Sequence, residues 1–129
     1  MKTIVTAHHP VRHLNSFKYA LRGISHAFLN EANFRVQLVI TIFSGALGFY
    51  FKISSIEWAF LVLSLGSLLS SEIINTVIEE FIDHLIHEHH EGARIIKDLS
   101  AGFVLTTSIT TLFILILVFG ERLLSFLFR

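Results

Sequence analysis

The chain has 129 residues, of which 53% are hydrophobic and only 16% are charged. A soluble domain usually carries about 25% charged residues, so this composition favours one membrane domain over a water-soluble protein. Ten acidic residues balance ten lysines and arginines, which gives no indication of a nucleic-acid partner, and the absence of cysteine excludes disulfides and thiolate chemistry.

Residues 14–30 are predicted to form an amphipathic surface helix. Apolar side chains recur there at spacings of three and four residues, at Leu14, Phe17, Leu21, Ile24 and Phe28. Lysine and arginine side chains lie outside this apolar face, as expected of a helix that lies in the membrane surface with its apolar face towards the lipid. The alternative is a core helix of a soluble protein, but the rest of the chain offers nothing soluble to receive it.

Three membrane spans are predicted, at about 34–51, 56–84 and 95–120. A spanning helix needs roughly 20 mostly apolar residues. The third run is long enough alone, and the other two are long enough when their polar ends are counted as interface. Ser54 and Glu57 have the spacing of a capping box, and Trp58 follows where an interfacial aromatic belongs. We therefore expect an all-α membrane protein whose single domain covers residues 1–129.

The distribution of lysine and arginine predicts the orientation. Three spans put the N-terminal arm and the 84–98 loop on one side of the membrane, and that side holds Lys2, Arg12, Lys18, Arg22, Arg35, Arg94 and Lys97. The other side holds Lys52, Arg122 and Arg129. The positive-inside rule places the first group in the cytoplasm, so the N-terminus and the polar chemistry are expected there.

An acidic stripe follows the apolar half of the second span. At about 100° per residue, Asn75, Thr76, Glu79 and Asp83 all fall within about 60° of Glu72, while isoleucine, valine and phenylalanine cover the other faces. Glu72 is 14 residues beyond Trp58, or about 21 Å along a helix, which is within a hydrocarbon core of roughly 30 Å. An ionisable group at that depth must face protein or a water-filled cleft. A solvated helix end explains Glu80 and Asp83, but it does not explain Glu72.

Two further polar segments could meet this stripe. The first is Asn30-Glu31 with Arg35, for which the alternative interpretation is a local Glu31–Arg35 salt bridge at i, i+4. The second is Arg94 with Lys97-Asp98, for which the alternative is positive-inside anchoring. Several carboxylates at one place suit Mg²⁺, which is commonly held by one or two of them with phosphates and water, and a lysine suits phosphate. The chain has no glycine-rich P-loop.

The same segments resemble the prokaryotic diacylglycerol kinase/undecaprenol kinase family. The matching pieces are Asn30-Glu31-Ala-Asn-Phe34-Arg35, the run from Glu72 to Asp83, and Lys97-Asp98-Leu-Ser-Ala101-Gly102. The resemblance extends from about Arg12 to the end of the third span. It implies an ATP- and Mg²⁺-dependent kinase that phosphorylates a lipid hydroxyl and assembles as a homotrimer with sites between protomers.

The resemblance also implies a role for each matching residue. Glu72 would be the general base that accepts the proton of the lipid hydroxyl, and Glu31 and Glu79 would bind the metal ions. The nucleotide would contact Asn75, Asp83, Lys97 and Asp98, together with the less distinctive positions Arg12, Tyr19 and His90. The lipid would be bound by Asn30, Phe34 and Arg35 beside Glu72.

Three alternatives concern the substrate and the class of protein. The diacylglycerol branch tends to carry Ala-Phe-Arg-Gln-Glu where this chain has Asn33-Phe34-Arg35-Val36-Gln37, so undecaprenol is favoured over diacylglycerol. The cluster His87-Glu88-His89-His90-Glu91 leaves open a metal-binding or metal-transport protein. A purely structural or regulatory membrane subunit is the remaining class.

Overall fold

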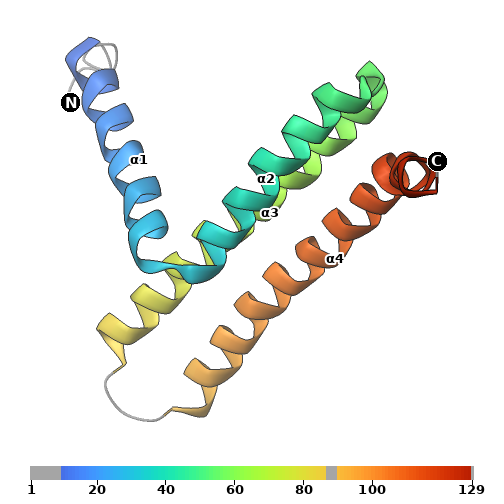
Figure 1. Ribbon diagram of the computed structural model, residues 1–129. Coiled ribbons are helices and arrows are strands. Elements are labelled where there is room, and N and C mark those ends of the chain that lie inside the picture. The colour runs from blue at the N-terminus through green and yellow to red at the C-terminus, as the bar shows by residue number, and fades with distance from the viewer. Residues whose placement is uncertain (1–9, 87–89, 129) are drawn as a thin grey trace.

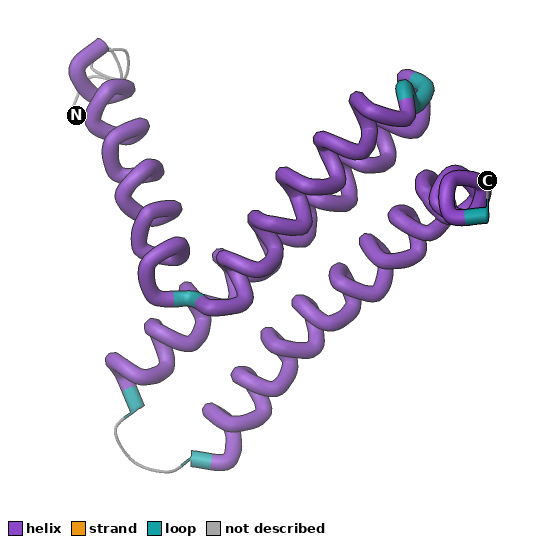
Figure 2. Tube along the Cα trace, viewed as in Figure 1, coloured by secondary structure: helices purple, strands orange, loops and turns teal. Residues whose placement is uncertain are grey.

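The computed structural model describes residues 10–86 and 90–128, and this part of the chain is entirely helical apart from short connections (Figures 1 and 2). The helices are α1 (Pro10–Asn30), α2 (Ala32–Phe51), α3 (Ser55–Leu85) and α4 (Glu91–Leu127). The predicted all-α class is confirmed. The first helix begins before residue 14, and the last extends beyond both predicted ends of the 95–120 span.

Three of these helices, α2, α3 and α4, are long and apolar enough to cross a membrane. Helix α3 has 31 residues and α4 has 37. At 1.5 Å per residue these are about 46 and 55 Å long, which exceeds a hydrocarbon core of about 30 Å. Each helix is therefore longer than one crossing of such a core requires.

The chain changes direction at Glu31, between α1 and α2, and α1 leaves the bundle there (Figure 1). Glu31 has an extended backbone (φ −99°, ψ 114°). The guanidinium of Arg35 donates to the carbonyl oxygens of Phe28 and Leu29 at 3.1 and 3.0 Å, so it satisfies acceptors that the end of α1 leaves free. Arg35 makes no ion pair with Glu31 in the described chain, and the local salt-bridge interpretation is wrong.

The turn between α2 and α3 is closed by backbone and side-chain caps. Lys52 adopts the left-handed conformation (φ 51°) and ends α2. The predicted capping box is confirmed: Ser54 N–H donates to the Glu57 carboxylate at 2.7 Å, and Glu57 N–H donates to Ser54 Oγ at 3.3 Å. A Cβ atom on Gly48 would lie 2.8 Å from the Trp58 ring, so only glycine allows the indole to pack on α2.

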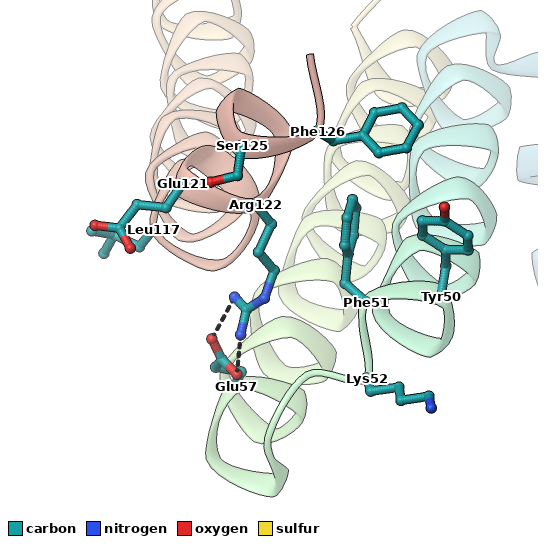
Figure 3. A pocket seen from close by; sticks show the side chains of 9 residues that line it. All are labelled: Tyr50, Phe51, Lys52, Glu57, Leu117, Glu121, Arg122, Ser125 and Phe126. Atoms are coloured by element: carbon teal, nitrogen blue, oxygen red, sulfur yellow. Dashed lines mark hydrogen bonds and ion pairs between the residues drawn. The ribbon is translucent and has the colours of Figure 1, made fainter. Parts of the chain in front are cut away.

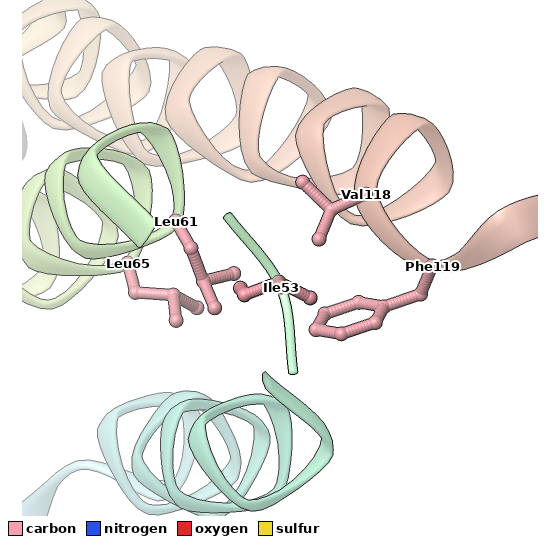
Figure 4. Packing of buried hydrophobic residues seen from close by; sticks show 5 residues of the cluster. All are labelled: Ile53, Leu61, Leu65, Val118 and Phe119. Atoms are coloured by element: carbon pink, nitrogen blue, oxygen red, sulfur yellow. The ribbon is translucent and has the colours of Figure 1, made fainter. Parts of the chain in front are cut away.

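Helices α3 and α4 pack together along most of their length. An apolar cluster near the α2–α3 turn contains Ile53, Leu61, Leu65, Val118 and Phe119 (Figure 4). Towards the other end, polar contacts replace it: Thr111 Oγ1 donates to the Ser64 carbonyl at 3.2 Å, and the Ser71 and Thr107 hydroxyls lie 2.8 Å apart. Small hydroxyl residues allow close helix approach in membranes, where polar groups must find partners inside the protein.

Candidate active site

Glu72 is the buried carboxylate of the described chain, with only 1% of its surface exposed. The amide of Gln37, on α2, donates a hydrogen bond to Glu72 Oε2 at 3.0 Å. Two buried oxygens of this pair, Glu72 Oε1 and Gln37 Oε1, have no hydrogen-bond donor. Because an unsatisfied buried polar atom costs about 1–3 kcal/mol, such atoms indicate a place where a donor is expected to bind.

The next carboxylate of the stripe, Glu79, is also oriented by a carboxamide. Asn75 donates from Nδ2 to Glu79 Oε1 at 2.9 Å, and its Oδ1 accepts a hydrogen bond of 2.6 Å from Ser100 Oγ on α4. Ser100 and Asn75 are both buried. Helix α4 therefore fixes the orientation of Asn75, and Asn75 in turn fixes that of Glu79.

The polar end of the stripe is joined to α4 by an ion pair. Lys97 Nζ lies 2.5 Å from Asp83 Oδ1, between residues 14 positions apart in the sequence. Arg94 pairs with Glu91 at 2.5 Å and with Asp98 at 2.9 Å on its own helix. The structure therefore brings Asp83 and Lys97 together, while Asp98 is held on the α4 surface.

The corner between α1 and α2 supplies the residues predicted to bind lipid. Phe34 is buried, whereas Asn30 is exposed and donates to the His26 carbonyl at 2.9 Å. The Glu31 side chain is half-buried and makes no hydrogen bond or ion pair in the described chain. Nearby, His26 lies 3.7 Å from Glu80, so a polar contact links α1 to α3.

Three of the predicted nucleotide contacts lie apart from this network. The exposed Tyr19 ring stacks near the Arg22 guanidinium, 5.9 Å from the ring centroid. His90 caps α4 and accepts a hydrogen bond from Gly92 N–H at 3.1 Å. Arg12 lies on the first turn of α1, and its side chain is outside the described residues, as is the 87–89 part of the histidine cluster.

The carboxylates divide into those with a cationic neighbour and those without. Glu57, Glu80, Asp83, Glu91 and Asp98 each lie within 4 Å of an arginine, lysine or histidine nitrogen. In the described chain, the ones without such a neighbour are Glu31, Glu72, Glu79 and Glu121. The first three are the residues predicted to act as the general base or as metal ligands. Amides orient Glu72 and Glu79, and each of these carboxylates keeps one oxygen that no described cationic side chain contacts.

No group of three or more acidic or histidine side chains in the described ranges is close enough to hold a metal ion by itself. Mg²⁺ usually takes only one or two carboxylates and completes its shell with phosphate and water oxygens. Glu79 has one oxygen free of the Asn75 bond, and the Glu31 carboxylate has no hydrogen-bond or ion-pair partner among the described residues. Each of these two carboxylates could contribute a ligand to a metal that arrives with a nucleotide, and the described residues form no preformed metal cage.

One groove reaches Gln37 of the buried pair, and a second groove lies under α1. One, of about 460 Å³, lies between α2 and α4 over Leu68 of α3, and Gln37 is part of its lining. The other, of about 540 Å³, lies under α1 and is lined by Phe28, Phe34 and Ile73 among others. Both are mostly apolar, as a lipid chain requires.

A cavity of about 760 Å³ lies at the opposite end of the bundle, beside the α2–α3 turn (Figure 3). Arg122 spans it and binds both Glu57 oxygens, at 2.8 and 3.1 Å. This cavity lies at the opposite end of α3 from the acidic stripe, and the ion pair between Arg122 and Glu57 links α4 to the N-terminal cap of α3. We therefore assign it a structural role and place the candidate site at the stripe.

Sequence reasoning missed Gln37 and Ser100, which hold the two key carboxylates in place. Gln37 is the chain's one glutamine and lies within an apolar span. A polar side chain in such a span is expected to have a buried hydrogen-bond partner. Ser100 carried no such signal, because serine in a membrane helix usually bonds to its own backbone.

Comparison with known proteins assigns the family. Residues 18–119 match the family model described as prokaryotic diacylglycerol kinase. The chain is 33% identical to the undecaprenol kinase of Bacillus subtilis (strain 168), over 87% of this chain and 91% of that protein. It is 31% identical to a diacylglycerol kinase of Synechocystis sp., over 78% of the chain but 58% of that protein. It is 30% identical to the diacylglycerol kinase of Haemophilus influenzae, over 70% of the chain and 77% of that protein. The chain therefore belongs to the prokaryotic diacylglycerol kinase family of membrane lipid kinases.

Proposed function

We propose that the chain transfers the γ-phosphoryl group of ATP to the hydroxyl of undecaprenol, giving undecaprenyl phosphate. The observation that carries this proposal is Glu72, a buried carboxylate with one oxygen bound by an amide and the other without a donor. Such an oxygen can accept a hydrogen bond from an alcohol that enters along an apolar groove. Membership of a kinase family supports this chemistry over metal transport or a purely structural role.

The reaction divides between the two ends of the stripe. Glu72 Oε1 would accept the hydroxyl proton, and the alcohol oxygen would attack the γ-phosphorus in line as the bond to the bridging oxygen breaks and ADP leaves. Catalysis would then depend mainly on holding the two substrates in this geometry. Glu72 is seven residues from Glu79, about 10 Å along the helix, so the lipid and nucleotide sides are neighbours.

The nucleotide would be held by the polar ends of α3 and α4. Lys97 is the point charge suited to a phosphate, and its ion pair with Asp83 keeps it beside the stripe. Asn75, Asp83 and Asp98 would complete the contacts, with Arg12, Tyr19 and His90 reaching the nucleotide from α1 and from the start of α4. Glu31 and Glu79 would hold Mg²⁺, which when bound neutralises charge on the phosphates.

Undecaprenol is proposed over diacylglycerol because the undecaprenol kinase relative aligns over nearly its whole length. Asn30, Phe34 and Arg35, at the α1–α2 corner, would border the lipid. We further propose that residues 1–129 form one domain, that α1 lies in the cytoplasmic membrane surface, and that three copies assemble. The positive-inside rule supports the orientation, and the many outward-facing apolar side chains support contact with lipid and with further protomers.

The proposal is tested with purified protein, radiolabelled ATP and mixed micelles that contain either undecaprenol or diacylglycerol. We expect label in undecaprenyl phosphate at a rate well above that in phosphatidic acid, with Mg²⁺ required. Glu72→Ala should abolish transfer, whereas Glu121→Gln, which changes an unpaired acid at the opposite end, should leave it unchanged. Preferred transfer to diacylglycerol would overturn the substrate, and retained activity in Glu72→Ala would overturn the base.

A further inference from the structure

Among the described residues, Gln37 is the α2 side chain that forms a hydrogen bond with the proposed base. The residue is 7% exposed, and its backbone carbonyl accepts a hydrogen bond from Thr41 Oγ1 at 2.8 Å. It meets Glu72 across 35 residues of sequence, in the layer where α2 crosses α3. Neither side chain has another side-chain hydrogen bond in the described part of the chain, so each fixes the position of the other.

The chemistry of this contact leaves the carboxylate ready to act as a base. An arginine or lysine in place of Gln37 would neutralise Glu72, and an apolar residue would leave both of its oxygens without a donor. The amide instead occupies Oε2 and leaves Oε1 as the one oxygen free to accept a proton. Gln37 Oε1, also without a donor, adds a second acceptor on the same pair.

We propose that Gln37 is a positioning residue for Glu72 and selects a neutral alcohol as the bound ligand. This inference rests on the proposed function, in which Glu72 is the base. Two buried acceptors require a donor, and a lipid hydroxyl supplies an O–H that both can share in a three-centre hydrogen bond. The phosphate ester formed by the reaction lacks that hydrogen at the ester oxygen, so the same two acceptors disfavour the product.

Other titratable groups lie on every helix packed around the pair, yet none forms a hydrogen bond or ion pair with Glu72 in the described chain. They include His26 on α1, Glu31 and Arg35 at the α1–α2 corner, Glu79, Glu80 and Asp83 on α3, and Arg94, Lys97 and Asp98 on α4. Gln37 is therefore the side chain that is hydrogen-bonded to Glu72 in the described chain, and the pH dependence of the reaction tests this contact.

The experiment compares Gln37→Glu, Gln37→Leu and the control Thr41→Val in the lipid kinase assay, from pH 5.5 to 9.5. In Gln37→Glu two carboxylates share the site and cannot both ionise easily, so half-maximal activity should move up by about one pH unit or more, with recovery at high pH. Gln37→Leu should lower kcat by roughly 10- to 100-fold at every pH, with KM for ATP within about twofold. Thr41→Val, which removes only a hydroxyl bonded to its own helix, should behave as the wild type.

Unchanged pH dependence in an active, folded Gln37→Glu enzyme would overturn the inference, as would a loss in Gln37→Leu that falls equally on kcat and on KM for ATP. Elution volume and thermal unfolding in detergent identify a variant that fails to fold, and the pH profile of Gln37→Glu then decides alone. The variant Glu72→Gln distinguishes a failure of the proposed function from a failure of the role assigned to Gln37. If Glu72→Gln stays active, the proposed base is wrong, whereas an inactive Glu72→Gln beside a wild-type-like Gln37→Glu refutes only the role of Gln37.

Discussion

Replacing Ser100 by alanine should loosen a carboxylate that it does not touch. Ser100 Oγ donates to Asn75 Oδ1 at 2.6 Å, and Asn75 donates to Glu79 at 2.9 Å. The same hydroxyl also lies 3.0 Å from the Lys97 carbonyl. Without it, Asn75 Oδ1 loses its donor, and only the bond to Glu79 still fixes the amide.

We expect Ser100→Ala to lower the stability of the protein only slightly and to lower its affinity for Mg²⁺ more strongly. An unsatisfied buried oxygen costs about 1–3 kcal/mol in soluble proteins, but interhelical hydrogen bonds in membranes average only about 0.6 kcal/mol. We therefore expect a loss of about 1 kcal/mol, too little to unfold the enzyme. Residues that orient a metal ligand typically change metal affinity about 10- to 100-fold, and Ser100 acts one step further out, so about tenfold is expected.

The assay measures kinase activity against free Mg²⁺ at saturating ATP and lipid. The Mg²⁺ concentration for half-maximal activity should rise about tenfold in Ser100→Ala, and the maximal rate should recover to within about twofold at high Mg²⁺. Thr106→Val is the matched control, because its exposed hydroxyl bonds only to the Gly102 carbonyl of its own helix. An unchanged Mg²⁺ response, or a loss of rate that no Mg²⁺ concentration restores, would refute the path from Ser100 to Glu79.

Two other substitutions test the ends of the bundle. Lys97→Met should raise KM for ATP by about tenfold or more, because it removes the point charge proposed for the phosphates; an unchanged KM in steady-state kinetics would exclude that role. Gly48→Ala should lower the free energy of unfolding by about 1–3 kcal/mol, because the new methyl would lie 2.8 Å from the Trp58 ring, and fluorescence of this single tryptophan during denaturation would detect it. Unfolding of Gly48→Ala at the wild-type denaturant concentration would show that the indole moves aside at no cost.

The sequence alone was sufficient for features that depend on neighbours within a few turns. The three apolar runs predicted three spanning helices, and the Ser54–Glu57 spacing predicted a capping box that the structure confirms. Helical periodicity placed Glu72, Asn75 and Thr76 on one face, and all three are buried. These features are local, because hydrophobicity, capping and the 3.6-residue repeat act within one helix.

The tertiary structure decided which side chains meet between helices. Glu31 and Arg35 have the spacing of an ion pair, but the chain turns at Glu31 and Arg35 binds the carbonyls at the end of α1 instead. The pairing of Glu72 with Gln37 depends on how far α2 is shifted along α3, and the contact of Asn75 with Ser100 depends on the rotation of α4. A helix repeat fixes the face that a residue occupies, but only the packing of one helix against another fixes what that face touches.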